Sequence, residues 1–374
     1  MDAEPGATGT AAALGEFALI DRLAAALAEV GAGGAPAPSG PVPSEVLGVL
    51  GGDLLGIGDD AAAWWPAPGA RALITTDSLI AGVHFRLDWT GWRDLGHKAL
   101  AVNVSDIAAM GGRPRLAVVS LGLTGREPVA GLLDLYRGLG ALAVRHGLTV
   151  AGGDVVRSPD RLGLHVTVVG ESWPDLGGRI LTRAGARPGD ALAVSGPLGS
   201  SAAGLALLAA RTDGGAPVDL AAVGATEGRA LLAAHLRPEP RVALGRLLVE
   251  AGARAAMDLS DGLFGDLAKV CAASGVAALV EEAALPVPAA VRSRFPDRWL
   301  DLATRGGEDY ELLFAAPPAV LDDVAARCRA AGLPIPARIG AVLPAGDAGP
   351  RIVLRRADGT DEVVRGGAFD HFGG

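Results

Sequence analysis

The chain has 374 residues, enough for two domains with separate cores, and 50% of them are hydrophobic, 20% charged and 4% aromatic. A formal net charge of −9 argues against non-specific nucleic-acid binding, which requires a basic face. The two cysteines, Cys271 and Cys328, lie far apart and form neither a disulfide framework nor a metal-binding spacing, which fits a reducing, cytoplasmic compartment.

The amino-terminal region is expected to begin with a disordered tail, because residues 1–14 are small and polar. A helix is predicted from Gly15 onward, since Leu19, Leu23 and Leu27 recur on one helical face. The first folded domain therefore starts near residue 15.

Two stretches have unusual composition. Residues 31–43 are rich in proline and glycine, and we expect a loop insertion there. Residues 191–210 carry no charge and are nominally long enough to span a bilayer, but Gly196-Pro197 interrupts them. A strand, a turn and a helix explain this run better, so we predict no membrane segment.

Polar and acidic side chains first gather between residues 74 and 112. A strand over Ala72–Ile74 is expected to deliver Thr75–Asp77 at its carboxyl end. From Trp92 the pattern turns helical and places Asp106 in line with an apolar stripe. A carboxylate there is costly to desolvate unless a cation or hydrogen-bond donors meet it. The alternative is an aspartate that bends back to water.

The remaining patterns alternate between strands and helices, which predicts an α/β protein with two domains. In the first half, strands are expected near residues 116–123, 148–151 and 162–168, with a helix over residues 129–146. In the second half, we expect strands over 191–195 and 255–257, helices over 199–211 and 319–331, a helical pair up to Gly252, and a helix ending near residue 273. The turn-rich residues 178–189 are the expected domain boundary.

One unit recurs along the chain: a short strand, glycine or a small polar residue, then acids. It occurs at Asp59-Asp60, Thr75–Asp77, Gly153-Asp154, Asp258–Asp261 and Glu308-Asp309. Oxygen ligands without histidine or cysteine suit a hard cation, above all magnesium. Glycines beside the acids would allow close approach of a phosphate. If these acids converge, their repulsion requires several cations, which would also neutralise a bound polyanion.

Each occurrence also has a plainer interpretation. Glycines before Asp59 and Asp60 are typical of an ordinary turn. Ser260 or Asp261 is a plausible helix N-cap. Tyr136 lies on an apolar helical stripe, so a core tyrosine is at least as well supported as a ligand contact. The tetrapeptide Asp258–Asp261 echoes Asn103–Asp106, although one echo does not establish a repeat.

Several catalytic classes are excluded by missing motifs. The chain has no Gly-x-Ser-x-Gly elbow, no Gly-x-x-x-x-Gly-Lys-Ser/Thr loop and no paired-histidine spacing for zinc. Phosphoryl transfer fits what remains, because its catalysis consists chiefly of positioning and charge neutralisation.

Taken together, the motifs closely resemble the thiamine-monophosphate kinase family, within the wider aminoimidazole ribonucleotide synthetase-like group. The matching motifs, in the family's order, are Gly15–Phe17, Gly56–Asp60, Thr75–Ser78 with His84-Phe85, Lys98–Gly111, Gly152–Asp154, Asp258–Gly262, Gly306–Leu312 and Asp370–Phe372. Two departures are Val155-Val156, where small polar residues are usual, and the insertion at 31–43.

The resemblance implies an α/β (α+β) fold with two domains. Residues 15–183 would form the amino-terminal domain that binds ATP and magnesium, and residues 184–374 a carboxyl-terminal α/β domain. The amino-terminal domains would pair into a dimeric barrel, which makes the protein a homodimer. ATP would donate its γ-phosphoryl group to thiamine monophosphate, giving thiamine diphosphate.

The resemblance also implies roles for individual residues. The expected magnesium ligands are Asp60, Thr75, Thr76, Asp77, Asp106, Asp154, Asp258 and Asp261. The expected nucleotide contacts are Tyr136, Gly153, Asp154, Arg183 and Ser260. The expected contacts to thiamine monophosphate are His84, Glu308 and Phe372. No residue is expected to act as a general base; the metals and Arg183 would support the transfer.

Two other functions stay open from the sequence. Another ATP-using enzyme of the same group is one, although a selenophosphate synthetase would need a reactive residue near its amino terminus and the first cysteine here is Cys271. A non-catalytic nucleotide-binding regulator is the other, but such a protein would not need to retain every acidic motif.

Overall fold

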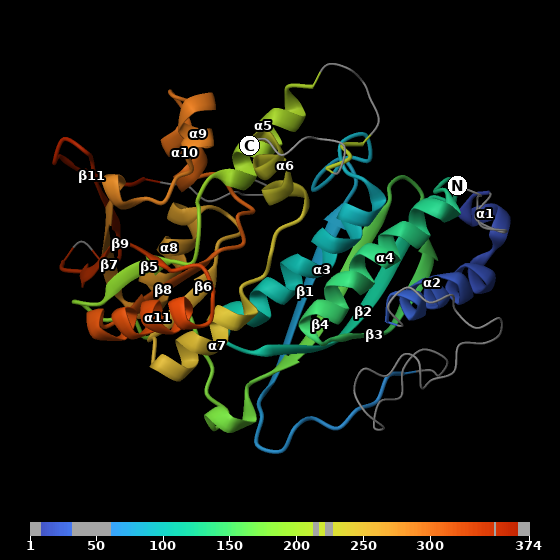
Figure 1. The fold of residues 1–374 in the computed structure, drawn as a ribbon, viewed down its shortest axis with the longest axis horizontal. Helices are drawn as coiled ribbons and strands as arrows, with labels where there is room; N and C mark the ends of the chain where they lie inside the picture. The colour runs from blue at the N-terminus through green and yellow to red at the C-terminus, as the bar shows by residue number, and fades with distance from the viewer. Residues whose placement is uncertain (1–8, 32–60, 212–216, 221–226, 348, 366–374) are drawn as a thin grey trace. The chain divides into compact units, whose positions relative to one another are not determined.

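The computed structural model describes residues 9–31, 61–211, 217–220, 227–347 and 349–365 (Figure 1). The chain divides into two compact units. The first unit contains the chain up to Val104 together with Pro114–Glu171 and residues 212–219. The second unit contains Ser105–Arg113, Ser172–Arg211 and the chain from Leu220 on.

The first unit is built on a four-stranded sheet with the order β1-β4-β2-β3. Its strands are β1 (Ala72–Ile80), β2 (Arg113–Leu123), β3 (Thr149–Arg157) and β4 (Gly163–Glu171). Strands β1 and β4 pair antiparallel, and β2 and β3 pair parallel. The helices that belong with it are α1 (Ala11–Leu14), α2 (Glu16–Gly31), α3 (Trp92–Ala109) and α4 (Val129–His146), of which α3 continues into the second unit.

The two faces of this sheet differ in burial because side chains alternate along each strand. On one face Leu164, Val166 and Val168 of β4 are buried, and helices α3 and α4 lie over the sheet (Figure 1). On the opposite face Ile74 of β1 and Val118 of β2 are exposed. Within the part of the chain that the structure describes, this face of the sheet is therefore largely uncovered.

The second unit contains a seven-stranded mixed sheet with the order β11-β10-β7-β9-β5-β8-β6. Its strands are β5 (Ala191–Val194), β6 (Ala255–Asp258), β7 (Val276–Glu281), β8 (Leu312–Ala316), β9 (Ala337–Pro344), β10 (Ile352–Arg355) and β11 (Asp361–Val363). Its helices are α5 (Ser200–Ala209), α6 (Glu227–Leu236), α7 (Val242–Ala251), α8 (Leu263–Ser274), α9 (Ala289–Arg294), α10 (Trp299–Thr304) and α11 (Pro318–Ala330).

Alternation along β5 divides the core of this unit into two clusters. Leu192 and Val194 pack in the cluster that contains α8, whereas Ala191 and Ala193 pack with residues of α7 and α11. The sheet is thus covered on both faces. This explains why β5 is apolar at every position, which had made residues 191–210 resemble a membrane span. Among the described residues, none of the helices has the length and apolarity to cross a bilayer.

Most predicted helices and strands agree with these bounds, with four corrections. Residues 1–14 were expected to be a disordered tail, but Ala11–Leu14 form helix α1, because the Ala11 amide bonds to the carbonyl of Glu127 and the Ala11 side chain is buried. Strand β1 does not end at Ile74 but continues to Ile80, because it pairs with β4 along its whole length. Strand β3 likewise runs through Gly152–Asp154, because it pairs with β2 as far as Arg157. The N-cap of α8 is Gly262, without a side-chain cap, so the prediction of Ser260 or Asp261 was wrong.

Candidate functional site

Residues from the two echoing tetrapeptides meet in the second unit. Ser105 lies near the end of α3, and its hydroxyl donates a hydrogen bond of 2.7 Å to the carboxylate of Asp258, at the end of β6. Ser105 is fully buried and Asp258 is nearly so, while the neighbouring Asp106 is half-buried. A buried acidic corner is therefore formed by residues 153 positions apart in the chain.

This corner is suited to a cation. Burial and, second to it, the charge of Asp106 raise the pKa of Asp258 to about 7, although the Ser105 hydrogen bond lowers it. A positive ion between the two carboxylates would offset both the desolvation and the repulsion. Within the described ranges, however, groups of three or more acidic, histidine or cysteine side chains close enough to hold a metal do not occur. The pair thus fits part of a magnesium site.

Asp261 is already paired with a cation from its own chain. The ammonium group of Lys269, on α8, contacts Asp261 and lies 2.8 Å from the carboxylate of Asp266. Asp266 is fully buried, and its other oxygen accepts a hydrogen bond from the Asp261 amide. Sequence reasoning missed Lys269 and Asp266. Asp266 lies five and Lys269 eight residues after Asp261, and their i,i+3 spacing on one helix was an available signal.

The segment Glu308–Glu311 lies against the motif that contains Asp258. The amide of Glu308 donates to the carbonyl of Ser260, and the amide of Tyr310 donates to the carbonyl of Leu259, each at 2.9 Å. Glu308 and Tyr310 have positive φ angles of 67° and 50°, which are uncommon for residues other than glycine. The pairing holds the segment in this conformation and places Glu308 beside the Ser260 backbone.

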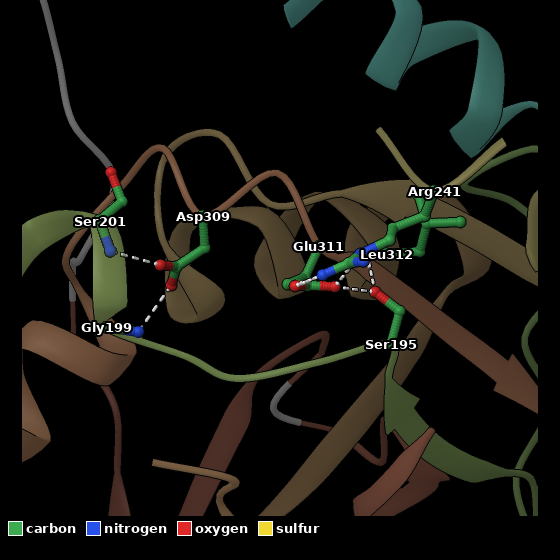
Figure 2. A network of polar contacts seen from close by, with 7 residues as sticks. All are labelled: Ser195, Gly199, Ser201, Arg241, Asp309, Glu311 and Leu312. Atoms are coloured by element: carbon green, nitrogen blue, oxygen red, sulfur yellow. Dashed lines mark hydrogen bonds and ion pairs between the residues drawn. The ribbon is translucent and has the colours of Figure 1, made fainter. Parts of the chain in front are cut away.

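The other two acids of this segment serve as anchors (Figure 2). Asp309 accepts hydrogen bonds from the amides of Gly199 and Ser201 at the beginning of α5, at 2.7 and 3.0 Å. Glu311 is buried and is held by the guanidinium of Arg241 and by the hydroxyl of Ser195. The sequence had grouped Glu308 and Asp309 in one acidic unit, but Asp309 serves as an anchor and Glu308 does not belong to this network.

In the first unit, a cavity of about 500 Å³ opens beside β2 and β3. Its lining includes Tyr136 from α4, the Gly152–Asp154 stretch of β3 and Thr167 of β4. Burial raises the pKa of Tyr136, so its hydroxyl stays protonated. The structure thus brings together three of the expected nucleotide contacts: Tyr136, Gly153 and Asp154.

Gly153 has a packing reason that does not involve a ligand. A Cβ atom at this position would lie 2.0 Å from the carbonyl oxygen of Val119 on the neighbouring strand. The close approach of β3 to β2 therefore requires glycine here. Close approach to a phosphate is not needed to explain this residue.

The acids of the two edge strands do not converge within the four-stranded sheet. Asp77 lies on β1 and Asp154 on β3, with β4 and β2 between them, which is roughly 14 Å of strand spacing. Thr76 lies opposite Thr167 and shares its face, so its neighbours Thr75 and Asp77 point to the other face. One ion with ligands at about 2.1 Å cannot be shared by Asp77 and Asp154 of one sheet.

The remaining expected residues lie elsewhere. His84 follows β1, and its Nδ1 accepts a hydrogen bond from the Ile80 amide at 3.1 Å. Arg183 is exposed, and its carbonyl accepts a hydrogen bond from Ser274. Asp60 and Phe372 lie outside the described residues.

Comparison with known proteins defines the class. The model of the AIR synthase related protein N-terminal domain matches residues 58–172, and the model of the corresponding C-terminal domain matches residues 187–352.

Similarity to individual proteins is more specific. The chain is 35% identical over 318 residues to thiamine-monophosphate kinase of Bacillus subtilis, covering 85% of this chain and 93% of that protein. The crystal structure of thiamine-monophosphate kinase from Stenotrophomonas maltophilia is 38% identical with a TM-score of 0.73, covering 82% and 93% of the two chains. A structure described as AaThiL complexed with AMPPCP and TMP is 30% identical with a TM-score of 0.68, covering 98% and 99%. The chain belongs to the thiamine-monophosphate kinase family.

Proposed function

We propose that this protein transfers the γ-phosphoryl group of ATP to thiamine monophosphate, giving thiamine diphosphate and ADP. The observation that carries the proposal is the 35% identity to the Bacillus subtilis kinase over 93% of that protein's length. The description of AaThiL complexed with AMPPCP and TMP supports both substrates. A cytoplasmic location is part of the proposal, because ATP is the phosphoryl donor.

The acceptor explains why a general base is not required. A phosphate monoester has its second pKa at about 6, so its oxygen is largely ionised at neutral pH. The main obstacle is repulsion between the acceptor phosphate and the nucleotide phosphates, which positive charge must reduce. Arg183 would contribute to this in the proposed site.

We propose that Asp106 and Asp258 hold magnesium, which neutralises phosphate charge when bound. Asp60, Thr75, Thr76, Asp77, Asp154 and Asp261 complete the proposed ligand set, and Tyr136, Gly153 and Ser260 would contact the nucleotide. Asp261 would also have to exchange or share its contact with Lys269. His84, Glu308 and Phe372 would bind thiamine monophosphate.

We further propose that residues 15–183 form the nucleotide-binding domain and pair with a second copy into a dimeric barrel. The uncovered face of the four-stranded sheet, with Ile74 75% exposed and Val118 39% exposed, supports this pairing. Among the described strands β1 and β3 are at the edges of this sheet, and a closed barrel would remove these edges. Because the edge strands carry Asp77 and Asp154, pairing between chains is one way to complete their surroundings.

The direct test is ADP release with thiamine monophosphate, thiamine and an aminoimidazole precursor compared side by side, with and without magnesium. We expect turnover with thiamine monophosphate alone, and none after magnesium is removed. Turnover with only the aminoimidazole precursor would assign another activity of the wider group. Nucleotide binding without turnover of any acceptor would favour a regulatory protein.

The acceptor role of Phe372 has a separate test. Deleting residues 368–374 should raise the KM for thiamine monophosphate while the KM for ATP barely moves, because a cation–π contact to a thiazolium contributes about 0.5–2 kcal/mol. Equal weakening of both substrates, or no change in either, would assign this segment to structure.

A further inference from the structure

A buried histidine contacts the carboxylate of Glu308. His235 is in the last turn of α6, and its Nδ1 lies 3.3 Å from Oε2 of Glu308. The His235 side chain is 7% exposed, whereas that of Glu308 is 27% exposed. The hydroxyl of Ser201, on α5, lies 3.1 Å from the same ring nitrogen. The histidine therefore forms the inner member of the pair and the glutamate the outer one.

The chemistry of this contact determines where the imidazole proton lies. An ionised carboxylate can only accept hydrogen bonds, so a favourable contact to Glu308 requires a proton on Nδ1. The Ser201 oxygen can accept from the same N–H group. With the proton on Nε2 alone, the Nδ1 lone pair would face the carboxylate. The charge of Glu308 and the Nδ1–H form of His235 therefore favour each other.

The backbone on either side of Glu308 is independently fixed. The Glu308 amide is bound to Ser260, and the next residue, Asp309, is bound to two amides at the beginning of α5. Two residues further on, Glu311 is held by Arg241 (Figure 2). What remains adjustable at Glu308 is its side chain, whose torsion angles cost entropy to order. His235 contacts this side chain and is the more buried of the two residues.

We propose that His235 is a positioning residue: its Nδ1–H holds the Glu308 carboxylate in place for the thiazolium cation of the acceptor. The inference rests on the proposed function, because it assigns Glu308 to the acceptor. It adds a residue outside every motif that defined the family resemblance. His235 acts through Glu308 and is not itself in contact with substrate.

Three variants test the role. His235→Leu removes the donor and should raise the KM for thiamine monophosphate about tenfold, as expected for loss of one charge-assisted hydrogen bond, while the KM for ATP stays within about twofold. His235→Asn retains an N–H donor close to the Nδ1 position and should restore most of the affinity. The matched control is His146→Asn, the same replacement at the end of α4 in the first unit, which should leave both KM values unchanged.

A double-mutant cycle decides whether the effect passes through Glu308. If it does, His235→Leu should have little further effect on the KM for thiamine monophosphate once Glu308 is replaced by glutamine. Additive effects would overturn the proposal. So would unchanged KM values in His235→Leu, or a joint loss of thermal stability and of affinity for both substrates that asparagine does not restore. Failure of the proposed function would be visible separately, as absence of turnover in the unaltered protein.

Discussion

The pKa of the Asp258 carboxylate depends on residues that are distant in sequence. Its pKa is raised to about 7 by burial and by the charge of Asp106, although its hydrogen bond to Ser105 favours the ionised form. An isolated aspartate ionises near pH 3.9. Two neighbouring carboxylates, one of them buried, are costly for the folded protein when no cation is bound, and this cost would make the corner sensitive to magnesium if the proposed site binds it.

Replacing Asp106 by asparagine should therefore reduce activity without destabilising the fold. We expect turnover to fall by about 100-fold or more, because the proposed metal site loses a ligand and its charge. The metal-free variant should melt at a higher temperature than the unaltered protein, because repulsion with Asp258 is removed, and magnesium should raise its melting temperature less. Thermal melts with and without magnesium, alongside ADP release, measure both effects.

The control for this variant is Asp134→Asn, which removes an aspartate whose side chain is 52% exposed, in the first unit. It should change neither turnover nor the response to magnesium. Near-normal turnover of Asp106→Asn at limiting magnesium would contradict the ligand assignment.

Asp309 should give the folded protein a distinct pH dependence. Its pKa is raised to about 7, chiefly by burial and also by the charge of Glu311, although the hydrogen bonds from the amides of Ser201 and Gly199 lower it. The unfolded chain loses this proton near pH 4, so between about pH 4 and pH 7 only the folded state retains it. The free energy of unfolding should consequently decrease as pH rises through this range, by about 4 kcal/mol relative to Asp309→Asn, since each of the roughly three pKa units contributes about 1.4 kcal/mol.

Urea unfolding of both proteins at about pH 4.5 and about pH 7.5 measures this difference. Asparagine retains a single oxygen to accept from Gly199 and Ser201, so the variant also loses stability that does not depend on pH. Comparing the change in unfolding free energy with pH in the two proteins removes this constant difference. Parallel pH dependence in the two proteins would show that Asp309 is ionised throughout, stabilised by the amides of α5.

At the level of elements, helices α3 and α4 approach so closely that glycine is required at the contact. A Cβ atom at Gly138 would lie 1.9 Å from the carbonyl oxygen of Arg93, and one at Gly96 would lie 1.8 Å from that of Leu135. Both obstructing atoms are backbone, so they cannot rotate away. These glycines set the distance between the helices that cover one face of the four-stranded sheet.

Gly138→Ala should destabilise the first unit by about 1–3 kcal/mol, because overpacking outweighs the gain in helix propensity. Gly140→Ala, two residues along the same helix, is the matched control. A Cβ there would meet a flexible side-chain atom of Leu27 at 3.2 Å, so the variant should be near neutral or slightly stabilising. Thermal melts compare the two, and equal stability would mean that the helices can move apart at little cost.

At the level of the whole molecule, the uncovered sheet face is the surface that a second chain would cover in the proposed barrel. Ile74 projects from it and is 75% exposed. A sheet whose described part exposes large apolar side chains on one face and ends in edge strands is prone to association. The proposed homodimer would satisfy both features at once.

Ile74→Glu should therefore shift the protein from dimer to monomer, because a charge would be buried at the interface without a partner. Light scattering at micromolar concentration measures the mass. Val144→Glu, on α4 at a position 47% exposed, is the control and should remain dimeric. A monomer mass for the unaltered protein would contradict the proposed homodimer.

The sequence by itself determined the local structure wherever periodicity was long. The helices over Trp92–Ala109 and Val129–His146 show sustained helical spacing of apolar residues, and this periodicity is visible within a single segment of the sequence. Strand ends were less predictable, since β1 and β3 continue as far as their partners β4 and β2 do. The family could also be predicted, because its motifs are short, local and ordered along the chain.

Only the tertiary structure decided which acids meet. It joined Ser105 to Asp258, anchored Asp309 and Glu311 away from Glu308, and placed His235 beside Glu308. It also put Asp77 and Asp154 on strands at opposite edges of one sheet, where sequence reasoning had assumed convergence. Such distances depend on strand order and on packing between segments far apart in the chain, and a short local motif determines neither.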